Sequence, residues 1–305
     1  MTDLIDKINK LRKEKNAVIL AHNYQIGQIQ DIADFTGDSL GLSIKAAATE
    51  AEVIVFCGVL FMAETAAILS PKKTVLLPDK EAGCPMADMI SAEQLQEMKN
   101  KYPQAEVVCY VNSSAKVKAL SDYCCTSSNA IEVVKSIEAD KEIIFIPDKN
   151  LGQHVMENTN RKLLLWPGYC PTHAQPPAED LKGIQAEHPG TITLAHPECN
   201  KELRLCANEL LSTGQMLDYV CRSENNEFII ATEIGIIHTL QKQNPNKKFY
   251  SASRRFVCPN MKKITLEKVL FSLEDMKYKI SIDEDIAEKA KVALERMVKV
   301  LPSGP

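Results

Sequence analysis

Residues 163–173 have the sequence LLLWPGYCPTH, an apolar run that breaks at a Pro-Gly turn and then delivers a cysteine, a proline and a histidine. The same Cys-Pro pair occurs at Cys84 and at Cys258, and each of these pairs also follows a strand-like run. The three pairs are 86 and 88 residues apart. This regular spacing predicts three repeats of one structural unit, each ending at a Cys-Pro turn.

The composition is typical of a soluble globular protein. The chain has 305 residues, enough for two or three domains, with 45% hydrophobic and 25% charged residues. Its net charge of −4 argues against nucleic-acid binding. No apolar run is long enough to span a bilayer, and the N-terminal residues lack the apolar core of a signal peptide. We therefore expect a cytoplasmic protein with neither a membrane nor a nucleic acid as partner.

Short apolar runs alternate with helical patterns in the same order three times. The expected strands are 17–21, 52–57 and 74–77, then 106–112, 142–148 and 162–166, then 191–195, 228–232 and 248–251. The expected helices between them are 29–49 and 61–69, then 115–123 and 151–158, then 201–211 and 234–241. This alternation favours parallel sheets that are covered by helices on both faces.

The predicted architecture is therefore an α/β fold with three similar parallel-sheet αβα domains around a pseudo-threefold axis. The expected units are 1–85, 86–171 and 172–258, and a C-terminal helical segment, 259–305, packs back on the body. An apolar stripe on that segment supports the packing. The stripe comprises Ile286, Ala290, Leu294, Met297 and Leu301.

Polar residues follow the first strand of each unit. They are His22 and Tyr24 in the first, Tyr110 and Asn112 in the second, and His196 and Glu198 in the third. Ligands of parallel α/β sheets bind beyond the carboxyl ends of the strands. Three such ends on one axis would bring these side chains and the three cysteines into one central cavity, where Glu198 is a plausible acid/base group.

Two interpretations of the cysteines are open. A single Cys-Pro pair would most simply be a buried thiol beside a turn-forming proline, but three at equivalent positions favour a shared site. Thiolates select zinc or iron–sulfur clusters, and proline follows a ligand cysteine in some cluster-binding segments. Three cysteines would leave one iron of a four-iron cluster open as a Lewis acid. The remaining cysteines are interpreted as core or incidental residues.

Two hydroxyl-rich segments could hold a carboxylate or a phosphate. They are 126–129, ahead of a helical pattern, and 212–214, whose glycine leaves its amide open. Each could instead be an ordinary helix N-cap, which is the more common role of a single motif of this kind.

Many ordered motifs across nearly the whole chain resemble those of the quinolinate synthase (NadA) family. They include AHNYQ at 21–25, GDSL at 37–40, CPMA at 84–87, YVNS at 110–113, TSSNA at 126–130, PDKNLG at 147–152, CPTH at 170–173, HPEC at 196–199, STGQM at 212–216, TEIG at 232–235 and CPNMK at 258–262. Thr172 stands where the family commonly has Val, and Leu211 where it has a small residue.

The resemblance implies a [4Fe-4S] cluster held by Cys84, Cys170 and Cys258. It implies condensation of iminoaspartate with dihydroxyacetone phosphate to quinolinate, phosphate and water, with a functional link to an iminoaspartate-producing aspartate oxidase or dehydrogenase. The expected catalytic residues are Tyr24, Glu198, His22 and His196. The expected substrate-binding residues are His22, Ser39, Tyr110, Asn112, Ser127, His173, His196, Glu198, Ser212 and Thr213.

Two other functions would also use three cysteines. An aconitase-type hydro-lyase acting on a small carboxylic acid would share the open iron. A redox-sensing iron–sulfur protein would want a fourth ligand and would not need histidine, tyrosine and glutamate at strand ends.

Overall fold

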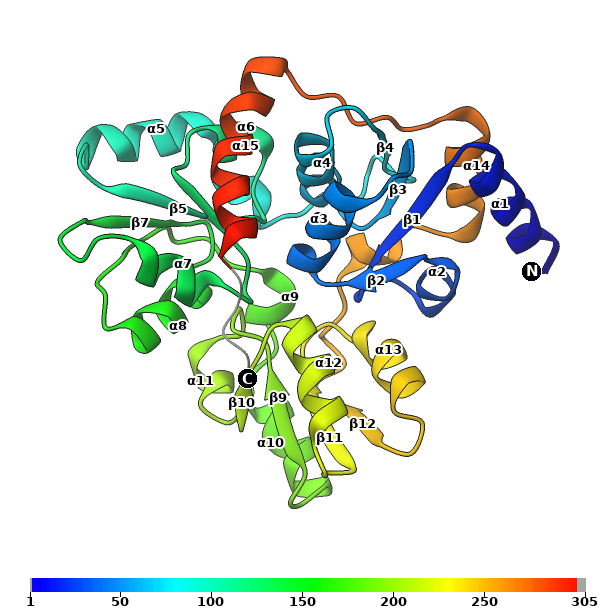
Figure 1. Cartoon of the computed structure of the whole chain (residues 1–305). Coiled ribbons are helices and arrows are strands. Elements are labelled where there is room, and N and C mark those ends of the chain that lie inside the picture. The colour runs from blue at the N-terminus through cyan, green and yellow to red at the C-terminus, as the bar shows by residue number, and fades with distance from the viewer. Residues whose placement is uncertain (1, 301–305) are drawn as a thin grey trace.

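The computed structural model describes residues 2–300. These residues form three four-stranded parallel sheets, one after another along the chain. Figure 1 shows the three sheets and their helices as three lobes around a common centre. The predicted fold of three similar parallel α/β units is confirmed.

The first unit has the strand order β2-β1-β3-β4. Its strands are β1 (Ala17–His22), β2 (Phe35–Gly37), β3 (Val53–Cys57) and β4 (Thr74–Leu76). Its helices are α1 (Thr2–Glu14), α2 (Gly27–Ile32), α3 (Ser39–Ala48) and α4 (Leu60–Leu69). The strands β1 and β3 are almost wholly buried, as expected for a sheet covered on both faces.

The second and third units repeat this order, as β6-β5-β7-β8 and β10-β9-β11-β12. The second contains α5 (Ala92–Lys101), β5 (Glu106–Tyr110), α6 (Ala115–Ala119), β6 (Tyr123–Cys125), α7 (Ala130–Ser136), β7 (Ile143–Ile146), α8 (Lys149–Thr159) and β8 (Leu164–Leu165). The third contains α10 (Ala178–Glu187), β9 (Ile192–Ala195), α11 (Lys201–Arg204), β10 (Glu209–Leu210), α12 (Thr213–Arg222), β11 (Glu227–Ala231), α13 (Ile236–Gln243) and β12 (Lys248–Ser251).

Each unit has one strand more than the sequence patterns predicted. The expected helix 29–49 is interrupted by β2, the helix expected at 115–123 ends before β6, and the one expected at 201–211 ends before β10. These strands have only two or three residues, too few to show a period of two against a helical background. They pair along the edge of the first strand, so the sheet and not the local pattern decides their conformation.

The chain after Cys258 forms three helical elements, η2 (Pro259–Lys262), α14 (Leu266–Asp275) and α15 (Glu284–Lys299). Helix α14 packs on α1, and α15 packs on α6, β6 and α4, so this segment links the first two units. The stripe residues Ala290, Leu294 and Met297 are fully buried, whereas Leu301 lies outside the described residues. The boundaries at 85, 171 and 258 stay a prediction.

None of the helices between residues 2 and 300 combines the length and the apolar character needed to cross a bilayer.

Candidate functional site

The strand ends of all three units meet at one cavity of about 250 Å³. His22 and Tyr24 reach it from the end of β1, Tyr110 and Asn112 from β5, and His196 and Glu198 from β9. The first strands carry their polar residues at matching positions because Ala21, Cys109 and Ala195 pair with the last residues of β3, β7 and β11. The predicted central cavity is therefore present.

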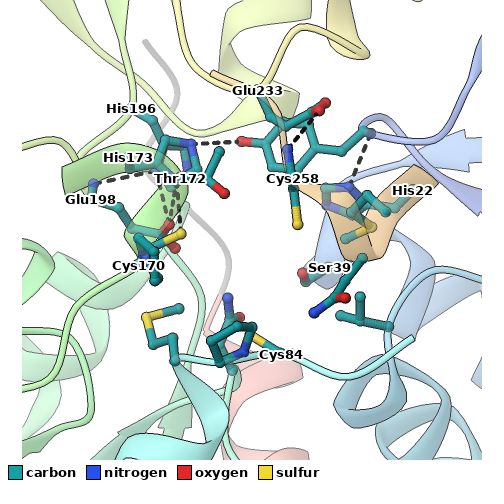
Figure 2. Close-up of a pocket in the computed structure, with 18 of the residues that line it drawn as sticks. His22, Ser39, Cys84, Cys170, Thr172, His173, His196, Glu198, Glu233 and Cys258 are labelled. Atoms are coloured by element: carbon teal, nitrogen blue, oxygen red, sulfur yellow. Dashed lines mark hydrogen bonds and ion pairs between the residues drawn. The ribbon is translucent and has the colours of Figure 1, made fainter. Parts of the chain in front are cut away.

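Cys84, Cys170 and Cys258 lie on this cavity, and Figure 2 shows their thiols directed into the same space. Cys170 is the N-cap of the short helix α9 (Pro171–Ala174), and Cys258 that of η2, each with proline at the first helical position. Cys84 precedes the short helix η1 (Ala87–Met89). Burial raises the pKa of each thiol, to about 12 for Cys84. A bound cationic centre would favour the thiolates, so the three donors fit a metal or cluster.

His173 connects Glu198 to Tyr24. Its Nδ1 lies 2.7 Å from Glu198 Oε2 and 3.2 Å from Cys170 Sγ. Its Nε2 lies 2.8 Å from Thr232 Oγ1 and 3.4 Å from the Tyr24 hydroxyl, which is in turn 2.5 Å from the same Thr232 oxygen. A carboxylate, an imidazole and two hydroxyls thus form a continuous hydrogen-bonded chain along the cavity wall, which can orient and relay a proton.

Glu198 is an ionised group in the interior. Burial by itself would raise the pKa of its carboxyl, but His173, then His196, together with the hydrogen bond that the Tyr110 hydroxyl donates, lower it to about 2. Burial and the neighbouring Glu198 raise the pKa of Tyr24 and of Tyr110 well above the ordinary value. Both phenols therefore keep their protons at neutral pH, whereas Glu198 remains a carboxylate.

His22 and His196 occupy equivalent places in the first and third units. In each, the ring Nδ1 accepts the amide of the residue two positions on, over 3.2 Å from Tyr24 and 3.3 Å from Glu198. This bond leaves the proton of the neutral ring on Nε2, which in His196 lies 3.1 Å from Ser127 Oγ. Burial lowers the pKa of both imidazoles to about 3. Both are neutral N–H donors at neutral pH and not acids.

The hydroxyl-bearing segments meet the cavity at helix starts. Ser39 and Thr213 are the first residues of α3 and α12, and both line the cavity, as does Ser127. Ser212 does not appear among the lining residues. Its side chain accepts the Gln215 amide and forms the capping box of α12.

Asn112 presents an unsatisfied acceptor. Its Oδ1 is buried without a hydrogen-bond partner among the described residues, although the side chain lines the cavity. A buried polar atom without a partner is costly, and a donor on a bound ligand would remove that cost. The cavity is thus built to receive a molecule with a hydrogen-bond donor.

Several lining residues were not identified from the sequence. Asp38 caps α3, Glu233 follows β11, and Arg255 lies toward the exposed side of the cavity. An apolar part of the wall comes from Val59, Phe61 and Met62 at the start of α4. Asp38 and Glu233 fall within motifs of the family resemblance, but their contacts follow only from the packing of distant units. The apolar residues look like ordinary helix core in the sequence.

One compact group of metal-binding side chains differs from the cysteine triplet. Donor atoms of Cys170, His173 and Glu198 all lie within 4.8 Å of one another. These donor atoms are close enough together to share one metal ion, and the two donor sets have Cys170 in common.

Comparison with known proteins identifies the family. The family model of Quinolinate synthetase A protein matches residues 6–299. A quinolinate synthase of Dehalococcoides mccartyi is 55% identical over 300 residues, covering 98% of this chain and 99% of that protein. A quinolinate synthase of Geobacter metallireducens is 52% identical over 96% of both chains. Quinolinate synthase 2 of Methanosarcina acetivorans is 52% identical over 97% of this chain and 96% of the relative. The chain therefore belongs to the quinolinate synthase family.

Proposed function

We propose that this protein condenses iminoaspartate with dihydroxyacetone phosphate to form quinolinate, phosphate and water. The observation that carries the proposal is the convergence of Cys84, Cys170 and Cys258 with the Glu198–His173 pair in one cavity. A family match over nearly the full length supports quinolinate synthesis, and it supports neither the hydro-lyase nor the redox-sensor alternative.

The three cysteines are the proposed ligands of a [4Fe-4S] cluster. They come from three separate units, lie on one cavity and have their thiols protonated by burial, which suits replacement of the protons by iron. Because no fourth cysteine is found among the described residues that line the cavity, the bound cluster would supply a Lewis acid at its open iron. His173 Nδ1 lies 2.7 Å from Glu198, so the carboxylate can fix the orientation of this imidazole.

The proton-carrying residues are His173 and Tyr24. Glu198 holds the Nδ1 proton of His173, which leaves Nε2 to exchange a proton with Thr232 or Tyr24. The raised pKa keeps the Tyr24 phenol protonated at neutral pH, so its proton is available for transfer and is replaced through the same chain. We therefore assign Glu198 to orienting the imidazole, while Tyr24 and His173 move the proton.

The neutral rings of His22 and His196 position the substrates. Their Nε2–H groups donate to carbonyl or carboxylate oxygens without adding a charge that would change with pH. The start of helix α12 at Thr213 and the hydroxyls of Ser39 and Ser127 hold the anionic groups. Asn112 Oδ1 accepts a hydrogen bond from a substrate group that carries a proton, such as an imine N–H.

Anaerobic assays of the purified protein test the function. After cluster reconstitution, iron and sulfide should each approach about four per chain, and quinolinate should form only when both substrates are present. Isomerisation of citrate without quinolinate formation would favour the hydro-lyase. A reversible one-electron signal without either product would favour the redox sensor.

We further infer that the protein works in the cytoplasm next to an enzyme that makes iminoaspartate, an aspartate oxidase or dehydrogenase. Its ten cysteines are free in the structure, as suits a reducing compartment. The imine hydrolyses in water, so a nearby source would limit its loss. Coupled assays should then give more quinolinate than the same total amount of imine supplied through a membrane that separates the two enzymes.

A further inference from the structure

The turns that carry the three cysteines are fixed by the same main-chain bond in every unit. In each unit, the third residue after the third strand along the chain (β3, β7 or β11) donates its amide hydrogen. The acceptor is the carbonyl oxygen of the residue two positions before the cysteine. The bonds join Leu60 to Ala82 (2.8 Å), Lys149 to Gly168 (2.9 Å) and Ile234 to Phe256 (2.9 Å). This bond therefore has the same position relative to the strand and to the cysteine in all three units, and it docks each cysteine turn on its sheet.

The residue just before each of those donors breaks this equivalence. In the second unit it is Asp148, whose Oδ2 accepts the main-chain amide of Cys170 over 3.0 Å. In the third it is Glu233, whose Oε1 accepts the amide of Cys258 over 3.1 Å. In the first unit the equivalent residue is Val59, which has no side-chain acceptor. Two cysteine amides are therefore tethered by a carboxyl oxygen, and Cys84 is not tethered in this way.

Both carboxylates are themselves immobilised. Each is fully buried, and its second oxygen is occupied. Asp148 Oδ1 accepts the Leu151 amide as the N-cap of α8, over 2.8 Å. Glu233 Oε2 accepts the Gly235 amide over 2.7 Å and the Lys262 ammonium over 3.0 Å. Because both oxygens of each carboxyl group accept hydrogen bonds, each side chain is fixed relative to its sheet. It therefore also fixes the cysteine amide that donates to it.

We propose that Asp148 and Glu233 are positioning residues that hold Cys170 and Cys258 in their metal-binding conformation, so that Cys84 is the least constrained of the three ligands. This inference rests on the proposed cluster. The tethers act on main-chain amides, so they set the direction of each Cα–Cβ bond before any metal is bound. Loss of iron would accordingly begin at Cys84.

The first test uses the apoprotein and needs no activity. Amide hydrogen exchange of protein labelled with ¹⁵N-cysteine should be slower at Cys170 and Cys258 than at Cys84. Asp148→Ser keeps an N-cap for α8, because serine caps helices well, but its shorter side chain cannot also reach the Cys170 amide. In this variant the exchange of Cys170 should accelerate while that of Cys258 stays unchanged. Equal exchange at all three cysteines in the unmodified protein would overturn the inference.

The second test uses the reconstituted holoprotein. Partners beyond the ligands typically affect metal affinity about 10–100-fold, so iron release to a ferrous chelator should accelerate by about that factor in Asp148→Ser and Glu233→Gln. The control is Asp283→Asn, which alters the carboxylate cap of α15 and contacts no cysteine. The control should release iron at the rate of the unmodified protein.

A merely structural role predicts a different pattern. Asp148→Ser and Glu233→Gln would then lower the melting temperature of the apoprotein but release iron at the unmodified rate, and that result would overturn the inference. An unmodified chain that takes up no iron would instead overturn the proposed cluster, and this inference with it.

Discussion

The turn after the third strand is apolar in the first unit and acidic in the other two. Val59 leads into Phe61 and Met62 on the cavity wall of the first unit, whereas Asp148 and Glu233 occupy the equivalent place in the second and third. One main-chain bond, from the third residue after that strand to the residue two positions before the cysteine, is nevertheless the same in all three units. The difference shows that parallel-sheet packing fixes the backbone of all three units. The side chains at the strand ends can therefore differ in chemistry and in function.

The largest effect is expected when any one of the three cysteines is replaced. These variants test whether the three cysteine turns are equivalent as ligand donors. Cys84→Ser, Cys170→Ser and Cys258→Ser should each lose the cluster and quinolinate formation, because serine is a poor ligand for iron beside thiolates. Iron content and activity measured anaerobically check this. Cys221→Ser, at an exposed position, is the control and should keep both. Full activity with a four-iron cluster in any of the three variants would remove that cysteine from the ligand set.

The next effect compares the first-strand ends of units three and one. Glu198→Gln removes the charge that holds the His173 proton, and Tyr24→Phe removes the hydroxyl at the other end of the chain. Each should lower kcat by about 10²–10⁴-fold, the usual size of general acid/base catalysis. Iron content verifies the cluster, and KM for both substrates should change far less than kcat. Near-normal turnover in both variants would contradict the proton chain.

A third prediction concerns the matched histidines of units one and three. Burial lowers the pKa of His22 and His196 to about 3, so between roughly pH 6.5 and 3 the unfolded chain binds protons that the folded chain does not. The free energy of unfolding of the apoprotein should therefore fall from pH 7 to pH 5, by roughly 1–2 kcal/mol for each histidine.

Urea denaturation of His22→Gln and His196→Gln at pH 7 and pH 5 measures these contributions. Each variant should show a weaker pH dependence than the unmodified apoprotein, and by a similar amount. Unequal changes would show that the two strand ends differ electrostatically despite their matching backbone.

A fourth prediction concerns Arg255, which lies at the exposed side of the cavity. Its guanidinium lies 3.8 Å from Asp180 and its side chain is 64% exposed, so solvent screens it. Arg255→Gln should raise KM for dihydroxyacetone phosphate only about 2–5-fold and leave kcat unchanged. Steady-state kinetics at two salt concentrations checks this, since added salt should reduce the difference. A fall in kcat would place Arg255 in the chemistry.

The smallest effect is expected at Met62, which lies in α4 just after the apolar turn of the first unit. Met62→Leu keeps the volume and the apolar character of a buried side chain, so it should cost less than about 1.5 kcal/mol of stability. Activity should stay within about twofold, corresponding to under roughly 0.5 kcal/mol in the barrier. Thermal unfolding and turnover measure the two quantities. A large loss of activity would mean that this turn does more than shape the cavity.

Much of the fold followed from local patterns. The buried strands are runs of apolar residues, and their alternation with helices gave the parallel sheets and three similar units. The edge strands β2 and β10 were wrongly assigned to helices, and β6 was missed, because pairing with the first strand overrides the preference of two or three residues.

The candidate site, like the fold, was predicted from the sequence only in part. Ten of the expected catalytic and substrate-binding residues line the cavity, because the residue after a parallel strand always emerges at the same edge. Ser212 is the exception, since its side chain is used in the capping box of α12. The functional roles of these residues stay predictions.

The sequence by itself determined three sheets, the strand ends that face one another, and the three Cys-Pro turns, since each depends on residues close together in the chain. Only the tertiary structure decided which groups interact across units. Tyr24 meets Thr232 across 208 residues, and Tyr110 meets Glu198 across 88. Burial at that junction keeps His22 neutral, whereas the neighbouring His173 and His196 keep Glu198 charged against the effect of burial. Electrostatics of this kind depend on the distance in space and on exclusion of water, and a pattern read along the chain contains neither.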